Sequence, residues 1–424
     1  MIKDGFKETK IGRIPEEWEV MYFKDIFQFI STSSHSKAQM TYDETENKIF
    51  NIHYGAIHTT YKEPILDFNK YNIPKITDDS NMPNEHQYLK SGDLVIVDAS
   101  EDAIGLGECV ELKNTNEEKV IGGLHTYAVR DKIGKTVQGF RGYILKNNNV
   151  KKILMSYANR SKVYGITKKS LGEVIVILPT LSEQQKIAEI LSTVDEAIEK
   201  TATIIEETRQ LKKGLMQSFF LNKAYMIKSR AEEENTNLKA VRLSDLGKIV
   251  TGTTPSTHVE EYYDSNDYMF IGPADLGNNK RIISSIKYIS NDGFEVSRKL
   301  PKDSVMVVCI GATIGKIGIT NEPSSTNQQV NTIIPSVNYS NNYIYYLLSG
   351  ISEYLRAFAG DTATPQLNKT DFGKVITFVH TDFDEREKIV RILSEVDTKI
   401  EKEEATKAEL EQLKKGLMQV LLTG

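Results

Sequence analysis

The chain has 424 residues, of which 39% are hydrophobic and 26% are charged, and its net charge is −5 at pH 7. This length exceeds a single ordinary core and predicts two or three domains, and the composition is that of a globular protein rather than a disordered one. The acidic balance argues against a protein that binds DNA alone through a wide basic face, but it allows a local basic surface or a partner that supplies the phosphate contacts.

The start of the chain and its cysteines indicate its cellular setting. Residues 1–7 lack the apolar run of a signal peptide, and no segment approaches the roughly 18 uncharged apolar residues that a membrane span needs. We therefore expect a cytoplasmic protein with no membrane partner. Cys109 and Cys309 lie about 200 residues apart, which offers neither a disulfide framework nor a thiolate metal site. Both are expected to be small, buried core residues.

The segment 15–180 has the pattern of a mixed domain. Short β-type runs, among them 94–97, are punctuated by glycine in its front part. A helix is predicted near 148–160, and a strand over 174–177 leads into a long helix. The predicted fold class is therefore α+β.

The long helix is predicted because the apolar residues of 182–217 recur at spacings of three and four. Its expected start is a capping box in which Ser182 and Gln185 satisfy free backbone amides. Extended to about residue 221, this helix would be roughly 60 Å long at 1.5 Å per residue, far more than one layer of a small domain. The segment is therefore expected to be a spacer.

The same helix occurs again at the end of the chain. Residues 182–217 and 384–419 align without a gap at a constant offset of 202, and 20 of the 36 pairs are identical. The second copy has the same apolar spacing and its own predicted capping box, Asp384 with Glu387. The roughly heptad apolar stripe of each copy favours pairing of the two copies in a two-stranded coil.

Between the helices lie a linker and a second globular segment. Residues 223–237 are polar and aperiodic after their first residues and are predicted to be the linker. The segment 238–382 contains a predicted strand over 305–308, a helix near 341–357 and a last strand over 375–378. Landmarks shared with the first globular segment, at offsets that drift through 220, 210 and 201, are Asp25 and Asp245, Asp93 and Asp303, and Gly172 and Gly373. Because insertions have accumulated in the globular segments but not in the helices, the helices are expected to do one task twice and the globular segments different tasks.

Several kinds of catalytic site are not supported. The stretch from Gly311 to Lys316 lacks the spacing and the hydroxyl residue of a phosphate-binding loop and is predicted to be a β-turn. The chain has no Pro-Pro pair for the base-holding loop of an adenine methyltransferase, and the hydroxyl run 31–34 has no nucleophile elbow. His53 and His58 have no second ligand cluster beside them and are expected to be ordinary hydrogen-bonding histidines. We therefore predict no catalytic residue, no metal and no cofactor.

The junctions 177–187 and 379–389 and the repeated Leu-Lys-Lys-Gly-Leu-Met-Gln resemble the specificity (S) subunit of type I restriction-modification systems, and the match covers essentially the whole chain. Weaker support comes from 11–18, 251–256 and 310–316. The second junction departs from the family pattern, because it reads Val-His-Thr-Asp-Phe-Asp-Glu-Arg-Glu where the family usually has Pro and Glu-Gln.

The resemblance implies two globular target-recognition domains separated by two long antiparallel coiled-coil helices in a pseudo-twofold repeat. Each domain would read one half of a split, asymmetric site in double-stranded DNA, and the helices would set the number of unspecified bases between the halves. Two methyltransferase (M) subunits that bind S-adenosylmethionine and methylate adenine would be partners, and separate motor-nuclease (R) subunits would hydrolyse ATP and cut. The chain itself would be a reader and no enzyme. The expected domains are a first target-recognition domain over 1–180, a central spacer helix over 181–222, a linker over 223–237, a second target-recognition domain over 238–382 and a C-terminal spacer helix over 383–424.

Residues that read DNA directly carry amide, guanidinium or hydroxyl groups on loops, with Asn and Gln suited to adenine and Arg and Lys to guanine. The candidates in the first domain are Thr32, Ser34, His35, Lys37, His125, Thr167 and Lys168. The candidates in the second domain are Thr253, Thr254, Ser256, Gln328, Gln329, Asn331, Gln366, Asn368 and Lys369. Lys168 and Lys369 fall at equivalent positions just before the last strand and are the strongest candidates for phosphate or base contacts.

Two other classes of function stay open. The first is a coiled-coil scaffold or adaptor without direct DNA binding, which the acidic balance mildly favours and the repeated strand-to-helix junction disfavours. The second is a DNA-modifying enzyme, which the absence of the catalytic loop disfavours.

Overall fold

The computed structural model describes residues 5–43, 49–61, 63–78, 88–160, 163–221, 237–277, 279–360 and 365–424. The chain divides into two compact units. The first unit comprises Met1–Ala202 with Ala405–Gly424, and the second unit comprises Thr203–Glu404. Each unit thus contains one globular domain, the first part of the long helix that follows this domain in the sequence, and the last part of the other long helix. The predicted linker 223–237 lies outside the described residues except for Asn237.

Each domain is built on a five-stranded sheet of the same topology. The order is β4-β13-β9-β11-β7 in the first domain and β18-β25-β22-β23-β20 in the second. All neighbours are antiparallel except the last pair of each sheet, which is parallel. The strands of the first sheet are β4 (Phe27–Ile30), β13 (Thr126–Asp131), β9 (Leu94–Val97), β11 (Cys109–Lys113) and β7 (Ile65–Asp67). Those of the second are β18 (Gly247–Thr251), β25 (Val330–Pro335), β22 (Val305–Val308), β23 (Ile317–Thr320) and β20 (Arg281–Ile282).

The central strands are β9 and β22, whose residues are all buried. Their runs of apolar, mostly β-branched residues are typical of strands that are covered on both faces. The predicted strands over 94–97 and 305–308 are therefore confirmed.

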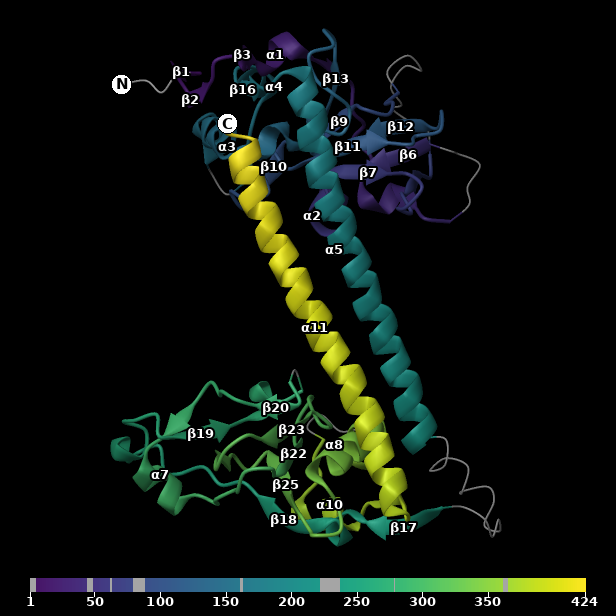
Figure 1. Cartoon of the computed structure of the whole chain (residues 1–424), viewed down its shortest axis with the longest axis vertical. Coiled ribbons are helices and arrows are strands. Elements are labelled where there is room, and N and C mark those ends of the chain that lie inside the picture. The colour runs from purple at the N-terminus through teal and green to yellow at the C-terminus, as the bar shows by residue number, and fades with distance from the viewer. Residues whose placement is uncertain are drawn as a thin grey trace. The chain divides into compact units, whose positions relative to one another are not determined.

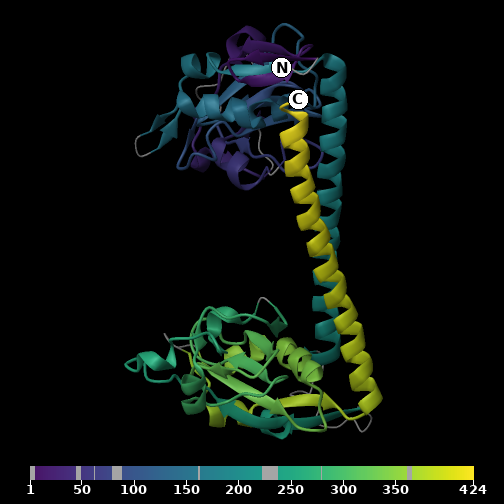
Figure 2. The ribbon, with the colours of Figure 1, turned by 60° about the vertical axis from the view of Figure 1, so that its left-hand side comes forward.

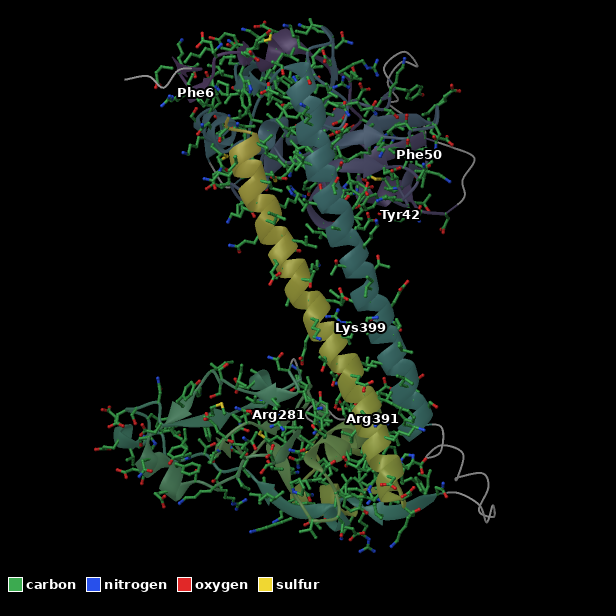
Figure 3. The ribbon with its side chains drawn as sticks, in the orientation of Figure 1. Phe6, Tyr42, Phe50, Arg281, Arg391 and Lys399 are labelled. Atoms are coloured by element: carbon green, nitrogen blue, oxygen red, sulfur yellow. The ribbon has the colours of Figure 1, made fainter. Side chains whose placement is uncertain are left out.

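A smaller sheet lies beside the large one in each domain. The order is β12-β6-β8-β5 in the first domain and β21-β19-β24 in the second. The first set is β12 (Lys119–Gly122), β6 (Ile49–Ile52), β8 (Lys75–Ile76) and β5 (Met40–Thr41), and the second is β21 (Tyr288–Ile289), β19 (Tyr268–Ile271) and β24 (Ser325–Thr326). Phe50, which lies on β6 (labelled in Figure 3), packs edge-on against Phe68 with ring centroids 5.7 Å apart.

Shorter elements complete the domains. In the first they are β1 (Phe6–Thr9), β2 (Gly12–Pro15), β3 (Glu19–Tyr22), α1 (Phe23–Ile26), η1 (Lys37–Gln39), α2 (Tyr54–Thr59), β10 (Ala99–Ser100), η3 (Arg141–Lys146), α3 (Asn148–Ser156), β14 (Asn159–Arg160), β15 (Tyr164–Gly165), α4 (Lys168–Gly172) and β16 (Ile175–Leu178). In the second they are β17 (Leu238–Arg242), η5 (Leu243–Asp245), η6 (Glu260–Tyr262), η7 (Pro273–Asp275), α7 (Asn291–Val296), α8 (Asn341–Gly350), α9 (Ser352–Phe358), α10 (Lys369–Lys374) and β26 (Ile376–His380). The last strand of each domain pairs with a strand at its beginning, β16 with β3 and β26 with β17.

The helix expected near 341–357 is interrupted after Gly350. This glycine packs so closely on the Phe220 side chain that an added Cβ would lie 2.8 Å from the Cβ of Phe220. Two helices, α8 and α9, stand in place of the single predicted one.

The two long helices are α5 (Leu181–Met216), which continues as a π-helical turn over Gln217–Leu221, and α11 (Phe383–Leu421). Each is one uninterrupted helix, teal and yellow respectively in Figure 1. The α+β class and the repeated long helix predicted from the sequence are confirmed.

The predicted caps of these helices are wrong by two residues. The first helix is capped by Thr180, whose hydroxyl accepts from the Glu183 amide at 3.3 Å while the Glu183 carboxylate accepts from the Thr180 amide at 3.0 Å. This capping box replaces the expected pair of Ser182 and Gln185. It is fixed by Trp18, whose indole Nε1 donates to the same carboxylate at 3.1 Å.

The second helix is likewise capped two residues before the predicted Asp384. The Asp382 carboxylate accepts from the Asp384 amide at 3.1 Å. At the position equivalent to Gln184, where the sequence departs from the family pattern, Arg386 donates to the carbonyl oxygens of His380 and Thr381. Gln184 donates in the same manner to the carbonyl oxygens of Pro179 and Lys135. The altered junction therefore keeps the local bonding of the first.

In each unit an aspartate of one long helix binds a lysine of the other. In the first unit Asp195 forms a salt bridge with Lys414 and accepts from the Tyr143 hydroxyl at 2.8 Å. We call this set the Asp-Lys-Tyr clamp of the first unit. Asp195 is buried, so both partners compensate the cost of removing its charge from water.

The second unit has an equivalent clamp. Asp397 binds Lys212 at 2.5 Å and accepts from the Tyr346 hydroxyl at 2.6 Å. Both the aspartates and the lysines are related by the repeat offset of 202. The clamp is therefore a duplicated feature of the fold.

The pairing is antiparallel in both units. In the first, Asp195 lies opposite Lys414, while the earlier residue Ile187 shares a hydrophobic core with the later residue Leu422. In the second, Lys212 lies opposite Asp397 and the earlier Arg209 lies opposite the later Glu404. The antiparallel arrangement expected of the helices is confirmed within each unit.

The end of α11 is part of the core of the first unit. Leu422 is buried, Leu417, Met418 and Leu421 pack against the same cluster, and the Asn147 side-chain amide donates to the Leu422 carbonyl. Figures 1 and 2 both show the last turns of α11 against the elements of the first domain. Residues 405–424 therefore complete this core.

Other expectations can be compared with the structure. Cys109 and Cys309 are free and buried, as predicted. The stretch after Gly311 is a turn between β22 and β23, also as predicted. Within the described residues, no helix combines the length and apolar character that crossing a bilayer requires.

Replacing Lys414 with Met tests the clamp of the first unit. Asp195 would lose its cation at a site where its side chain is 8% exposed, so we expect the unfolding free energy of this unit to fall by about 3 kcal/mol. Trp18 is the single tryptophan of the chain and is buried in the first unit, so its fluorescence during urea unfolding reports this unit. The matched control is Lys407→Met, which removes an exposed pair with Glu411 on the same helix and should cost less than about 1 kcal/mol. Equal losses in both variants would contradict the prediction.

Glu111 predicts a pH dependence of the first unit. It is buried, accepts from the amides of Gly139 and Gly142 at 2.6 and 3.0 Å, and has a pKa raised by burial from 4.5 to about 7. The folded state holds this proton more tightly than the unfolded state, so the stabilisation is full below about pH 4.5 and is lost as the pH rises through 7. The loss should be on the order of 3 kcal/mol. Trp18-monitored unfolding at a series of pH values should show a flatter profile for Glu111→Gln than for the unchanged chain, and identical profiles would refute this assignment.

Candidate nucleic-acid interface

Three loops of each domain meet at one edge of the five-stranded sheet. In the first domain they follow β4 (31–37), precede β13 (123–125) and precede α4 (166–167). The pairing register places the end of β4, the start of β13 and the end of β9 at this same edge, because Ile30 lies opposite Ala128 and Thr126 lies opposite Val97. These loops carry every candidate of the first domain except Lys168, which begins α4.

Backbone hydrogen bonds connect the loops of the first domain through Asp98, the residue after β9. The Asp98 amide donates to the His125 carbonyl at 3.2 Å, and the Ile166 amide donates to the Asp98 carbonyl at 2.9 Å. The Ser33 amide donates to the Gly122 carbonyl at 2.8 Å. Three segments distant in the sequence are thereby held side by side.

The second domain repeats the two bonds made by the residue after the central strand, and it holds its first loop by a different bond. The Cys309 amide donates to the Gln329 carbonyl at 2.8 Å, and the Leu367 amide donates to the Cys309 carbonyl at 2.7 Å. The Gly252 amide donates to the Val330 carbonyl at 3.1 Å. Cys309 thus occupies the place of Asp98. The structure brings together the candidates on the loops 252–256, 327–331 and 366–369.

Most of the candidates present polar atoms to solvent. Exposed candidates are Ser34, Lys37, His125, Thr167, Lys168, Thr254, Ser256, Gln328, Gln366, Asn368 and Lys369, and half-buried ones are Thr32, Thr253 and Gln329. Thr167 and Asn368 also cap the short helices α4 and α10, where their side chains accept from the amides of Ser170 and Asp371.

Two candidates are buried and are better explained as supports of the loops. His35 is 3% exposed, and its Nε2 lies 3.7 Å from the Asp78 carboxylate. Asn331 is 2% exposed, accepts from the Thr251 hydroxyl at 2.5 Å and donates to the Leu367 carbonyl at 3.1 Å. Neither side chain lies at the surface of its unit.

The two lysines at equivalent positions differ in their surroundings. The Lys168 ammonium lies 5.9 and 5.7 Å from the ring centroids of Phe29 and Tyr127, so its position is fixed by cation–π contacts. The Tyr127 hydroxyl donates to the Ile166 carbonyl at 3.0 Å and links these rings to the third loop. Lys369 is exposed at the start of α10.

The structure adds three residues that the sequence alone did not indicate. Arg298 donates through Nη1 to the Thr251 carbonyl at 2.8 Å, and its amide donates to the Thr253 hydroxyl at 3.0 Å, so it holds the first loop of the second domain. Asp98 and Tyr54 join the interface of the first domain. Asp98 could have been found from the sequence, because it directly follows a predicted buried strand. Arg298 could not, because it bonds to a loop 45 residues away.

The charges at the interface are local. Lys37 and Lys168 lie in the first domain and Arg298 and Lys369 in the second, although the chain as a whole carries −5. Burial raises the pKa of Asp98, and the charges of His125 and Lys168 oppose this shift. A surface of this kind offers hydrogen-bond donors and cations in a fixed arrangement, which suits binding of a polyanion rather than covalent chemistry.

The two histidines considered as metal ligands lie next to this interface. Burial lowers the pKa of His53, with a contribution from Lys37, and the His58 Nε2 is buried without a hydrogen-bond partner among the described residues. The described part of the chain contains no group of three or more His, Cys, Asp or Glu side chains arranged to hold a metal ion.

The sequence and fold match one family of proteins. The family model for the type I restriction modification DNA specificity domain matches residues 15–209 and again 235–412. The chain is 26% identical over 442 residues to the putative type I restriction enzyme MjaX specificity subunit of Methanocaldococcus jannaschii, covering all of this chain and 96% of that protein. It is also 26% identical over 300 residues to the type I restriction enzyme HindI specificity subunit of Haemophilus influenzae, covering 55% of this chain and 65% of that protein.

Two solved structures share the fold. The S subunit of a type I restriction-modification system from M. genitalium aligns over 96% of both chains with a TM-score of 0.58 and 15% identity. A chain from a study of complex assembly and conformational transition of the type I R-M system aligns over 97% of this chain and 99% of its own length, with a TM-score of 0.62 and 15% identity. At this identity the likeness concerns the fold.

Asn331→Leu tests whether the buried amide holds the loops of the second domain together. The variant removes the bonds to Thr251 and Leu367, and we expect the Leu367 amide to exchange with solvent deuterium about tenfold faster, which corresponds to about 1.4 kcal/mol. Hydrogen exchange resolved at the peptide level measures this change. Asn338→Leu, at an exposed site in the same domain, is the control and should leave the exchange of this loop unchanged. Unaltered exchange in Asn331→Leu would show that the loops are held by other contacts.

Proposed function

The chain belongs to the type I restriction-modification DNA specificity family, and from this premise we propose that it reads a bipartite, asymmetric site in double-stranded DNA with one half-site for each domain. It acts in the cytoplasm as the non-catalytic subunit of a complex with two methyltransferase subunits, and in the full complex with motor-nuclease subunits. The partners carry out adenine methylation and cleavage.

One observation carries this proposal. The two domains present three loops at the same sheet edge, and in each the residue after the central strand joins two of these loops by equivalent backbone hydrogen bonds, but the side chains differ. His125 and Asp98 in the first domain correspond to Gln329 and Cys309 in the second. A shared framework with unlike donors and acceptors is what reading two different base sequences requires.

The acidic net charge fits a reader that works with partners. Phosphate contacts supply most of the affinity for DNA but no sequence information. A chain with a few local cations at its loops can select the sequence while other subunits supply the remaining phosphate contacts. A scaffold without DNA binding would not need duplicated clusters of exposed polar side chains.

The proposed role of the long helices is to set the distance between the half-sites. Each clamp fixes the register of one long helix along the other, because Asp195 pairs with Lys414 and Asp397 pairs with Lys212. Lengthening the helices should therefore change the spacer in the DNA site.

The experiment on the function measures both half-sites at once. The complete complex with its methyltransferase partner is expressed in a host that lacks other adenine methylation, and methylated adenines are mapped across the genome. We expect one split motif with two different halves and a fixed spacer. A chain that binds the methyltransferase but directs no sequence-selective methylation or DNA retention would exclude the proposed function and favour the scaffold.

Inserting four helical residues after Thr203 tests the spacer role. This lengthens α5 by about 6 Å, or about two base pairs of DNA, and should change the accepted spacer. A second variant with a matched insertion after Ala405 lengthens both helices and should give the same new spacer with higher activity, because both clamps keep their partners. Mapping of methylated adenines measures the spacer, and the original spacing in both variants would refute the role.

Lys369→Ala should weaken DNA binding by the assembled complex without disturbing the fold. Lys369 is exposed, so its loss removes one cation near the DNA, and the slope of log affinity against log salt should become shallower by about 1. Binding isotherms at several salt concentrations measure this slope. Lys374→Ala on the same short helix is the control, since Lys374 pairs with Asp371 at 3.7 Å. Isotherms that do not change would remove Lys369 from the interface.

A further inference from the structure

His125 has a backbone conformation that few non-glycine residues adopt. Its φ is +55°, in the left-handed region that non-glycine residues rarely adopt. This conformation costs roughly 1 kcal/mol and persists only where the surroundings fix it. Glycine adopts this conformation without the cost, and the same loop has a glycine at position 123. The position therefore points to a requirement for the imidazole.

The backbone of His125 is fixed on both sides. Its carbonyl accepts from the Asp98 amide at 3.2 Å, and the preceding Leu124 carbonyl accepts from the Tyr54 amide at 3.3 Å. The next residue, Thr126, is buried and its hydroxyl donates to the Gly123 carbonyl at 2.7 Å. The loop thus has little freedom to change the direction of the side chain.

The imidazole is fixed as well but remains accessible. Its Nδ1 lies 3.6 Å from the Asp98 carboxylate, and the Tyr54 ring meets it at 90° with centroids 5.2 Å apart. The side chain is 50% exposed. Because Nδ1 faces the carboxylate, Nε2 on the other side of the ring is the nitrogen available to a ligand.

The charges around His125 come from several elements. Asp98 follows β9, Lys168 begins α4, and Tyr54 and His58 lie on α2. A cleft of about 800 Å³ that His125 shares with Tyr54 and His58 also carries Glu101 and Asp102. When the imidazole is protonated, Nδ1 faces the Asp98 carboxylate and Nε2 is a hydrogen-bond donor.

We propose that His125 determines base specificity in the first half-site by donating from Nε2 to an acceptor on a guanine edge, O6 or N7, and that Asp98 is its positioning residue. This inference rests on the proposed function, since it names the base class that the first domain reads. The major-groove edge of guanine presents two adjacent acceptors, which suits a cationic donor. The second domain has Gln329 and Cys309 at these positions and should read a different base there.

The test uses the complete complex and His125→Asn. Asparagine tolerates the left-handed conformation, so the loop should keep its backbone while the imidazole is lost. Trp18 fluorescence confirms that the first unit stays folded. Methylation mapping should show relaxed selection at one base pair of the first half-site and no change in the second half-site, which serves as the internal control.

Base analogues identify the atom that is read. In the unchanged complex, 7-deazaguanine or 2-aminopurine in place of one guanine of the first half-site should weaken binding about tenfold, and His125→Asn should not respond to the replacement. Asp98→Asn tests positioning, because without the carboxylate at Nδ1 the response to the guanine analogues should shrink. Asp98→Glu should restore this response, and a failure of Asp98→Asn to change it would remove Asp98 as the positioning residue.

Two outcomes overturn the inference while the proposed function stands. One is an unchanged motif and an unchanged analogue response in His125→Asn. The other is sensitivity of the unchanged complex to loss of an adenine or cytosine amino group opposite His125, which would make a neutral imidazole the acceptor. Loss of a split motif in the unchanged complex would instead contradict the proposed function.

Discussion

The pairing of an aspartate, buried in the first unit and mostly buried in the second, with a lysine from the other long helix is the constraint on which the architecture depends. A buried carboxylate is costly without its cation, so each helix has one favoured position along its partner. The tyrosine that donates to the same carboxylate comes from the globular domain, Tyr143 in one unit and Tyr346 in the other. The clamp therefore connects a globular domain with the long helix that follows it in the sequence and with the last part of the other long helix.

The duplicated framework would allow one chain to carry out the two different recognitions proposed for it. In both domains the residue after the central strand joins two of the loops through backbone hydrogen bonds, which do not depend on side-chain identity. Side chains at these positions are then free to differ, as Asp98 and Cys309 do. In this proposal the strands and the clamp stabilise each unit, and a few loop residues provide the selectivity.

Features that depend on periodicity were predicted correctly from the sequence. Features that depend on contacts between residues distant in the sequence were not. The repeat and its apolar spacing gave the helices, and the buried runs gave the central strands. The start of the first helix was predicted two residues late, because the cap at Thr180 is fixed by Trp18, a residue 162 positions earlier that donates to the Glu183 carboxylate. Asn331 was a candidate for reading adenine because of its amide group. It is buried, however, and its hydrogen bonds to Thr251 and Leu367 hold the loops together. No local motif predicts Arg298, because its side chain donates to the Thr251 carbonyl at the end of β18, 47 residues away.

Residues 405–424 belong to the first unit, although they follow the second domain in the sequence. A ribosome completes the first globular domain early, but the apolar surface that receives Leu422 stays uncovered until residues 417–422 have been translated. A product that stops before residue 417 lacks this cover and exposes that surface to proteases and chaperones. The core of the first domain is therefore complete only after the second domain has been synthesised.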